Sequence, residues 1–152
     1  MPDIIDVKRA IIEVLKSDET LRGLLGKDGR NDYPIYHAFI QHRIHRPCIT
    51  VEDVTDKAEN AGLNDAFDGD KRYQWQHAVI QIDCWSSKNP NERDKLQVAV
   101  QKCLLKNQDL LREKGIIYMQ EPLVFPLDEV NVKPPLWRKC LRYHVFYILE
   151  AS

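Results

Sequence analysis

The sequence predicts an α+β protein, with a single antiparallel or mixed β-sheet and helices packed on one face of it. Three observations indicate this class. Separate segments carry apolar residues at helical spacing, several runs have strand-like composition, and hairpin-like loops join the strand runs while the helices stand apart. The length of 152 residues, with 43% hydrophobic and 30% charged residues, fits one domain over residues 1–152.

Two helices are predicted near the N-terminus. Residues 4–16 carry one apolar stripe, and Asp3 stands where a helix N-cap is expected. A second short helix is predicted over 18–25, because Gly26 follows it and favours a helix end.

Two predicted strands flank an unusual segment. One strand covers 48–54 and begins after Pro47, and the clearest strand of the chain covers 72–85. Residues 55–71 between them follow neither the helical nor the strand period. Because so long a connection is typical of functional loops, we expect residues 55–71 to project from the sheet.

A long helix is predicted over 91–107, directly after the best strand. Ser87 or Asn89 serves as its cap, and residues 108–114 extend or flank it. The remaining strands lie beyond Gly115. One covers 116–125 and is broken by a proline, and a long final strand over 136–149 is rich in aromatic and β-branched residues.

The totals exclude some classes of protein. A net charge of −1 gives no general attraction to nucleic acid or anionic membrane, and no apolar run approaches the roughly 20 residues that cross a bilayer. The acidic start lacks a signal-peptide core, so we expect the protein to be made and used in the cytosol. We therefore interpret the four cysteines as buried, reduced thiols: Cys48, Cys84, Cys103 and Cys140.

No motif for catalysis or metal binding stands out. The chain has no nucleophile elbow, no phosphate-binding loop and no zinc-protease motif. The spacing of His37, His42 and His45 fits no zinc pattern, so these histidines read as part of a polar connector. Asp83 lacks the partners of a metal-dependent nuclease. We therefore expect no catalytic residue, no metal and no cofactor.

Charge is distributed unevenly along the chain. Residues 52–72 hold seven acids and three bases, whereas residues 130–149 hold four bases and no acid. Both segments can be solvated faces, or an acidic arm can meet a basic strand on a neighbouring copy and so build a ring. The acids do not have the spacing of a calcium loop. The candidate interface residues are Asp65, Asp68, Asp70, Trp137, Arg138, Lys139 and Arg142.

Several short motifs occur in a characteristic order. They are a D-x-x-L-x-x-L-x-G turn at 18–26, Ile-Tyr at 35–36, a proline-led strand at 46–51, V-I-Q-I-D-C-W-S at 79–86 and Arg-Tyr at 142–143. In this order the chain resembles the tail-completion proteins of tailed bacteriophages, also called tail-terminator or head–tail joining proteins. The acidic segment 55–71 and residues 110–135 depart from that pattern.

The resemblance implies a structural role. Members of that family form rings, commonly sixfold, that end the tail tube and join it to the head connector. It implies a homo-oligomer with a tube protein and a connector or stopper protein as partners. The location would be the head-proximal end of the tail, after assembly in the host cytoplasm, with nucleic acid only passing through the ring. Asp83 would be a hydrogen-bond or charge partner and Trp85 an aromatic anchor.

Two other functions remain open from the sequence. The basic segment 133–142, with Trp137 and Tyr143 interleaved, could follow a phosphate backbone and stack bases, as in a nucleic-acid-binding or nuclease-like phage protein. A small-molecule enzyme would need a pocket with converging polar groups, for which no sequence feature argues.

Overall fold

The computed structural model describes residues 2–27, 31–37, 47–58, 66–131, 133 and 135–151. Along these residues, pairs of helices precede runs of strands. The helices are α1 (Ile4–Lys16), α2 (Glu19–Leu25), α3 (Pro90–Lys106) and α4 (Gln108–Glu113). The strands are β1 (Ile35–His37), β2 (Cys48–Ala58), β3 (Ala66–Asp68), β4 (Lys71–Ser86), β5 (Ile116–Met119), β6 (Leu123–Pro126) and β7 (Trp137–Ala151).

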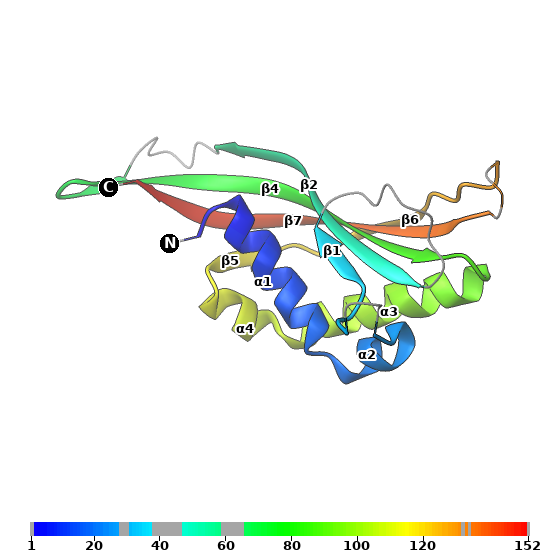
Figure 1. Ribbon diagram of the computed structural model, residues 1–152. Coiled ribbons are helices and arrows are strands. Elements are labelled where there is room, and N and C mark those ends of the chain that lie inside the picture. Colours follow the sequence, from blue (N-terminus) through cyan, green and yellow to red (C-terminus); the bar gives the residue numbers. More distant parts are fainter. Residues whose placement is uncertain are drawn as a thin grey trace.

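The described strands form one sheet of seven. Its order is β1-β2-β4-β7-β5, with β3 also paired to β4 and β6 to β7. β1 runs parallel to β2, while the other pairs are antiparallel. The four described helices all lie on one side of the sheet (Figure 1). The predicted fold class, a mixed sheet with helices on one face, is confirmed.

The core lies between the sheet and the helices. Successive strand residues point to opposite faces, so alternate residues of the two longest strands meet the helices. The buried residues on that face are Ala78, Ile80, Ile82 and Cys84 of β4, and Leu141, Tyr143, Val145 and Tyr147 of β7. The stripe of α1 packs there through Val7, Ile11 and Leu15, and α3 adds Leu96, Val100 and Leu104.

Helix starts follow the predicted caps. Asp3 accepts a hydrogen bond from the backbone N–H of Asp6 at 2.9 Å, and the Asp6 carboxylate accepts one from Asp3 at 3.2 Å. This reciprocal pair satisfies two donors that a helix start leaves unpaired. Asn89 caps α3 by accepting from the N–H of Glu92 at 2.8 Å.

Within the predicted loop at 55–71, most of the residues that the structure describes lie in strands. β2 continues to Ala58 beside β4, and Ala66–Asp68 pair with Lys71–Tyr73; residues 59–65 lie outside the described residues. A register shift between Asp53 and Thr55 explains the difference. A bulge changes which residues face the core, so the alternating pattern stops although the strand does not.

The region around Gly115 follows the prediction that residues 108–114 extend or flank the long helix and that a proline breaks the strand over 116–125. Residues 108–113 form a separate short helix, α4, and Pro122 falls between β5 and β6, which pair with different parts of β7. Gly115 has φ +104°, and a Cβ there would stand 2.6 Å from Cγ of Pro2. The close approach of Pro2 and the positive φ both require glycine.

Candidate functional site

The face of the sheet opposite the helices is the candidate functional surface, and we call it the open face. It carries the alternate residues that the core does not use: Trp75, His77, Val79, Gln81, Asp83 and Trp85 of β4, and Arg138, Cys140, Arg142, His144 and Phe146 of β7. β5 and β6 add Tyr118, Leu123 and Phe125, which stand opposite Phe146, Arg142 and Cys140. No described helix covers this face (Figure 1).

One half of the open face holds a buried polar network around Asp83. Asp83 is 1% exposed and accepts two hydrogen bonds from the amide of Gln81, at 3.0 and 3.2 Å. Arg142 donates to Gln81 Oε1 at 2.8 Å, and Arg138 approaches the Asp83 carboxylate to 3.6 Å. The network gives Asp83 both hydrogen bonds and an opposite charge, which a buried carboxylate requires.

Trp85 closes the end of this network. It is 1% exposed, its indole N–H donates to the Thr50 hydroxyl at 3.0 Å, and the Arg138 guanidinium lies 4.7 Å from a ring centroid of the indole. With Cys48 and Leu136 it forms a small cluster separate from the main core. The architectural roles that the resemblance implied for Asp83 and Trp85 agree with these contacts.

Burial and the charge of Asp83 shift the pKa values of neighbouring side chains. The pKa of Glu52 is raised, mainly by burial and then by the nearby carboxylates of Asp83 and Asp53. Burial, and next the hydrogen bond to Asp83, raise the pKa of the Cys140 thiol to about 12. Both shifts favour the neutral form, because burial disfavours the charged one.

The other half of the open face is aromatic. The imidazoles of His77 and His144 are joined by a hydrogen bond of 2.6 Å between Nε2 and Nδ1, and His77 stacks on Phe146 with ring centroids 4.5 Å apart. Tyr118 of β5 contacts the same Phe146 at 5.9 Å. The sequence analysis missed these residues, since their proximity depends on the register of two distant strands.

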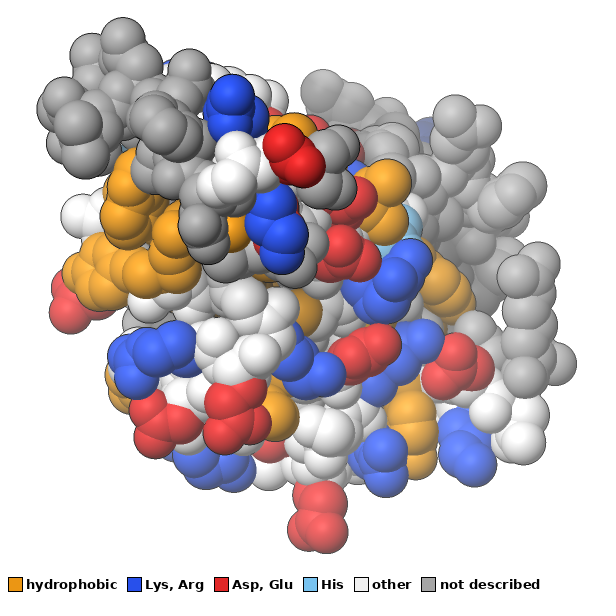
Figure 2. All heavy atoms as spheres, turned by 90° about the vertical axis from the view of Figure 1, so that its left-hand side faces the viewer, with side chains coloured by type: hydrophobic (Ala, Val, Ile, Leu, Met, Phe, Trp, Pro, Cys, Tyr) orange, Lys and Arg blue, Asp and Glu red, His pale blue; other side chains and the backbone are white. Residues whose placement is uncertain are grey.

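Large apolar side chains on the open face reach solvent. Tyr118 is 57% exposed, Leu123 64% and Trp75 39%. From the end of the molecule nearest the viewer in Figure 2, charges of both signs are interspersed and hydrophobic side chains gather on one flank. Exposed apolar side chains that form a contiguous patch mark contact surfaces, so these three are candidates for contact with another subunit.

The predicted acidic residues lie at one end of the sheet. Asp70 is exposed in the turn between β3 and β4, and Asp68 ends β3 opposite Lys71. Asp65, like His42 and His45, lies outside the described residues. His37 ends β1 and is exposed; burial and then Lys8, Arg9 and Lys16 lower its pKa.

The predicted basic residues already have partners within the chain. Arg138 meets Asp83 and Glu129, and Arg142 bonds to Gln81 and stacks on Phe125 at 5.2 Å. Lys139 points to the other face, where it pairs with Asp94 of α3 at 3.4 Å. The basic strand therefore offers less free positive charge than the sequence indicates.

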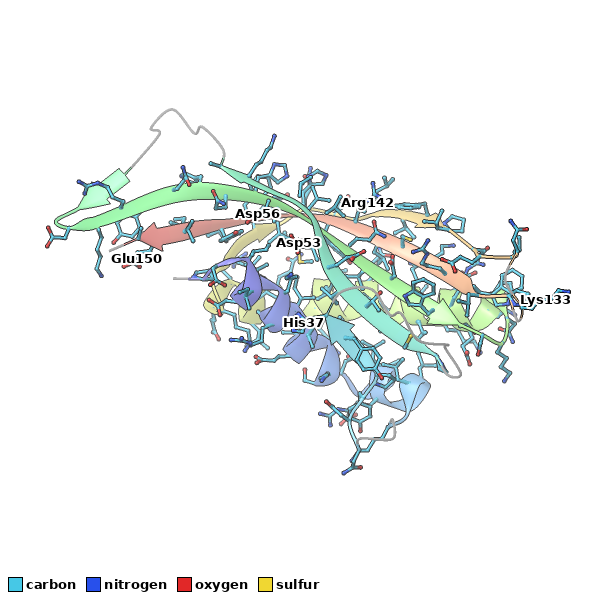
Figure 3. All side chains as sticks on the ribbon, turned by 45° about the horizontal axis from the view of Figure 1, so that its top comes forward. His37, Asp53, Asp56, Lys133, Arg142 and Glu150 are labelled. Carbon is cyan, nitrogen blue, oxygen red and sulfur yellow. The ribbon has the colours of Figure 1, made fainter. Side chains whose placement is uncertain are left out.

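The acidic and basic sets occupy opposite ends of the sheet. Trp137, half-buried at the start of β7, pairs with Ser86, whereas Ala151 pairs with Arg72 beside the acidic turn. Glu150 and Lys133 mark these two ends (Figure 3). At about 3.3 Å per residue the length of β4 keeps Asp68 and Asp70 apart from Arg138, so a contact between them needs two copies.

The structure also describes the sites where a small ligand could bind. A pocket of about 340 Å³ opens between α3 and the β5–β6 connection. Its lining combines apolar side chains with polar ones: Leu104, Leu105, Met119, Pro122, Tyr143, Gln101, Gln108, Gln120 and Glu121. Among the described residues, no three His, Cys, Asp or Glu side chains gather as a metal site would require. Of the described helices, none combines the length and the apolar character needed to cross a membrane.

These features define a class: an α+β protein whose mixed sheet is covered by helices on one face and carries a polar network and exposed aromatic residues on the other. No family model and no curated protein matches the chain. Among solved structures, a chain of the "Virion of native gene transfer agent (GTA) particle" is similar, with 12% identity over 93% of this chain and 94% of that chain and a TM-score of 0.47.

Proposed function

We propose that this protein is a structural virion component of tail-completion type, which forms a ring at the head-proximal end of a phage tail. The observation that carries the proposal is the open face, where Trp75, Tyr118 and Leu123 are exposed on a sheet that no described helix covers there. Burial of such side chains against another subunit is favourable at about 25 cal/mol per Å² of apolar area. The order of motifs that resembles tail-completion proteins supports the ring and its partners, a tube protein and a head connector.

The proposal assigns the chain a role in protein binding and no catalytic residue or cofactor. Its buried Asp83 network holds the shape of the surface, and its exposed aromatic residues supply contact area. Aromatic residues contribute a large share of the binding free energy at protein interfaces.

Light scattering behind size exclusion, over a range of protein and salt concentrations, tests the self-association. The expected result is a discrete species near six times the 17.8 kDa chain mass, with or without added tail tubes as template. Replacement of Leu123 by Ser should weaken that species. The matched control is Leu105→Ser, since Leu105 is 67% exposed but lies on α3, on the opposite face. A chain that stays monomeric and is not captured by tail tubes contradicts the proposal.

The acidic residues have a separate test. Neutralisation of Asp65, Asp68 and Asp70 together should prevent assembly if an acidic arm contacts the neighbouring copy. Rings that form unchanged in this triple variant would reject the arm and leave the open-face surface intact.

Nucleic-acid binding through residues 133–142 is the competing function. Because Arg138, Lys139 and Arg142 are paired within the chain, we expect no salt-sensitive band shift with DNA at low salt. A shift that weakens steeply with salt would favour the competing function.

A further inference from the structure

The hydrogen-bonded imidazoles of His77 and His144 have no role in the proposed assembly. They come from β4 and β7, two strands that meet only through the sheet register, where His77 stands opposite Phe146 and His144 opposite Val79. Nε2 of His77 and Nδ1 of His144 are 2.6 Å apart. One of these two nitrogens must therefore carry a hydrogen and the other must be a lone pair.

We propose that this imidazole pair is a pH-sensitive switch. Two neutral rings, or one neutral and one protonated ring, keep the hydrogen bond, and protonation of both rings breaks it. With both rings protonated, neither nitrogen at the contact is an acceptor, so the hydrogen bond is lost. Two positive charges would then face each other at hydrogen-bond distance, where repulsion on a partly buried surface is strong.

Charged groups of both signs lie near the pair. Lys57 of β2 is the cross-strand partner of His77, and Arg142 precedes His144 by two residues on the same face of β7. From β5 the facing titratable group is the hydroxyl of Tyr118. Carboxylates lie near the pair as well. Glu52 and Glu150 stand opposite Gln81 and Tyr73, each four residues along β4 from His77, and Glu121 follows Gln120, whose backbone N–H donates to the carbonyl of His144 at 2.8 Å. The repulsion between the two protonated rings, and not the surrounding charge, is what breaks the contact.

Loss of the His77–His144 hydrogen bond would affect side chains as far as β5, at the edge of the sheet. His77 is stacked on Phe146 with an interplanar angle of 15°, and Phe146 in turn contacts Tyr118 of β5. Separation of the two imidazoles disturbs that stack, and Tyr118 is more than half exposed on the surface. A metal ion is a poorer occupant of the pair, because two imidazoles supply half of a tetrahedral zinc site and no third described ligand joins them.

Histidine side-chain NMR on the full chain, titrated from about pH 8 to pH 4.5, tests the switch. We expect His77 and His144 to take up their protons in two steps separated by more than about one pH unit, as coupled groups do. The ring signals of Tyr118 should shift with the second step only. Two imidazoles that titrate together in one step would overturn the proposal.

Single variants provide the controls. In His77→Asn and in His144→Asn the remaining imidazole should titrate in one step, while His37→Asn, on the distant β1, should leave both steps unchanged. If His144 titrates identically with and without His77, the pair is not coupled and the switch is rejected. These readouts need no assembly, so they succeed or fail independently of the ring.

Discussion

Among single residues, Asp83 has the most demanding environment, because its carboxylate is buried on a sheet face that the helices do not cover. Replacement by Ala would leave Arg138 and the Gln81 amide without their partner, at a cost of about 3–5 kcal/mol in the free energy of unfolding. Asp83→Asn should cost less, since it keeps one acceptor. Urea unfolding measures both values.

A matched surface control separates burial from charge. Asp109 also faces an arginine, Arg112, but its side chain is 95% exposed, so Asp109→Ala should change stability by less than about 0.5 kcal/mol. Equal losses at the two positions would show that the network around Asp83 has no special role.

Tyr143 contrasts with Asp83, because its buried polar group has no partner among the described residues. Its hydroxyl is buried and has no hydrogen-bond partner, and burial raises the pKa of this phenol above its usual value. Tyr143→Phe removes the unsatisfied group and keeps the ring, so we expect stability to be unchanged or higher by about 1 kcal/mol in urea unfolding. A loss of more than about 1 kcal/mol would mean that the hydroxyl has an ordered partner.

For the secondary-structure elements, the junction of α4 and β5 depends on Gly115. Gly115→Ala should lower the free energy of unfolding by about 1–3 kcal/mol, because the new Cβ meets Pro2 and the positive φ is strained. The matched control is Gly23→Ala in α2. A Cβ added there would meet no atom within 4 Å outside its own helix backbone, and helix propensity favours Ala. Thermal unfolding should move in opposite directions for the two variants.

The elements that the sequence could predict are those with local signals. α1 and α3 have a continuous helical period and a capping side chain within a few residues of their first turn. β2 beyond Asp53 could not be predicted, because the bulge there interrupts the alternation. Fewer of the candidate site residues could be predicted from the sequence. Asp83 and Trp85 came from a short motif, whereas the His77–His144 contact depends on a pairing between strands far apart in the chain.

In the molecule as a whole, four thiols lie buried and free, which confirms the prediction for Cys48, Cys84, Cys103 and Cys140. Burial raises the pKa of Cys48 to about 12 and that of Cys103 to about 11. In the unfolded chain the thiols ionise near pH 8.5. Their contribution to stability is therefore complete below about pH 8.5 and is lost as the pH rises toward the folded values.

The expected outcome is a fall in the free energy of unfolding between about pH 8 and pH 10, measured with urea in the presence of a reductant. Each thiol that ionises only in the unfolded chain adds a slope of about 1.4 kcal/mol per pH unit. Cys48→Ala should reduce that slope. A stability that does not change across this range would show that the thiols ionise equally well in the folded protein.

The order of strands in the sheet bears on synthesis as well as on the finished protein. β4 lies at the centre and is complete at Ser86, but its partner on one side, β7, ends at Ala151. While the ribosome makes the intervening segment, one edge of β4 has donors and acceptors with no strand to meet them. Nascent chains close together on one messenger could pair through that edge, so slower translation after β4 should favour aggregation over folding.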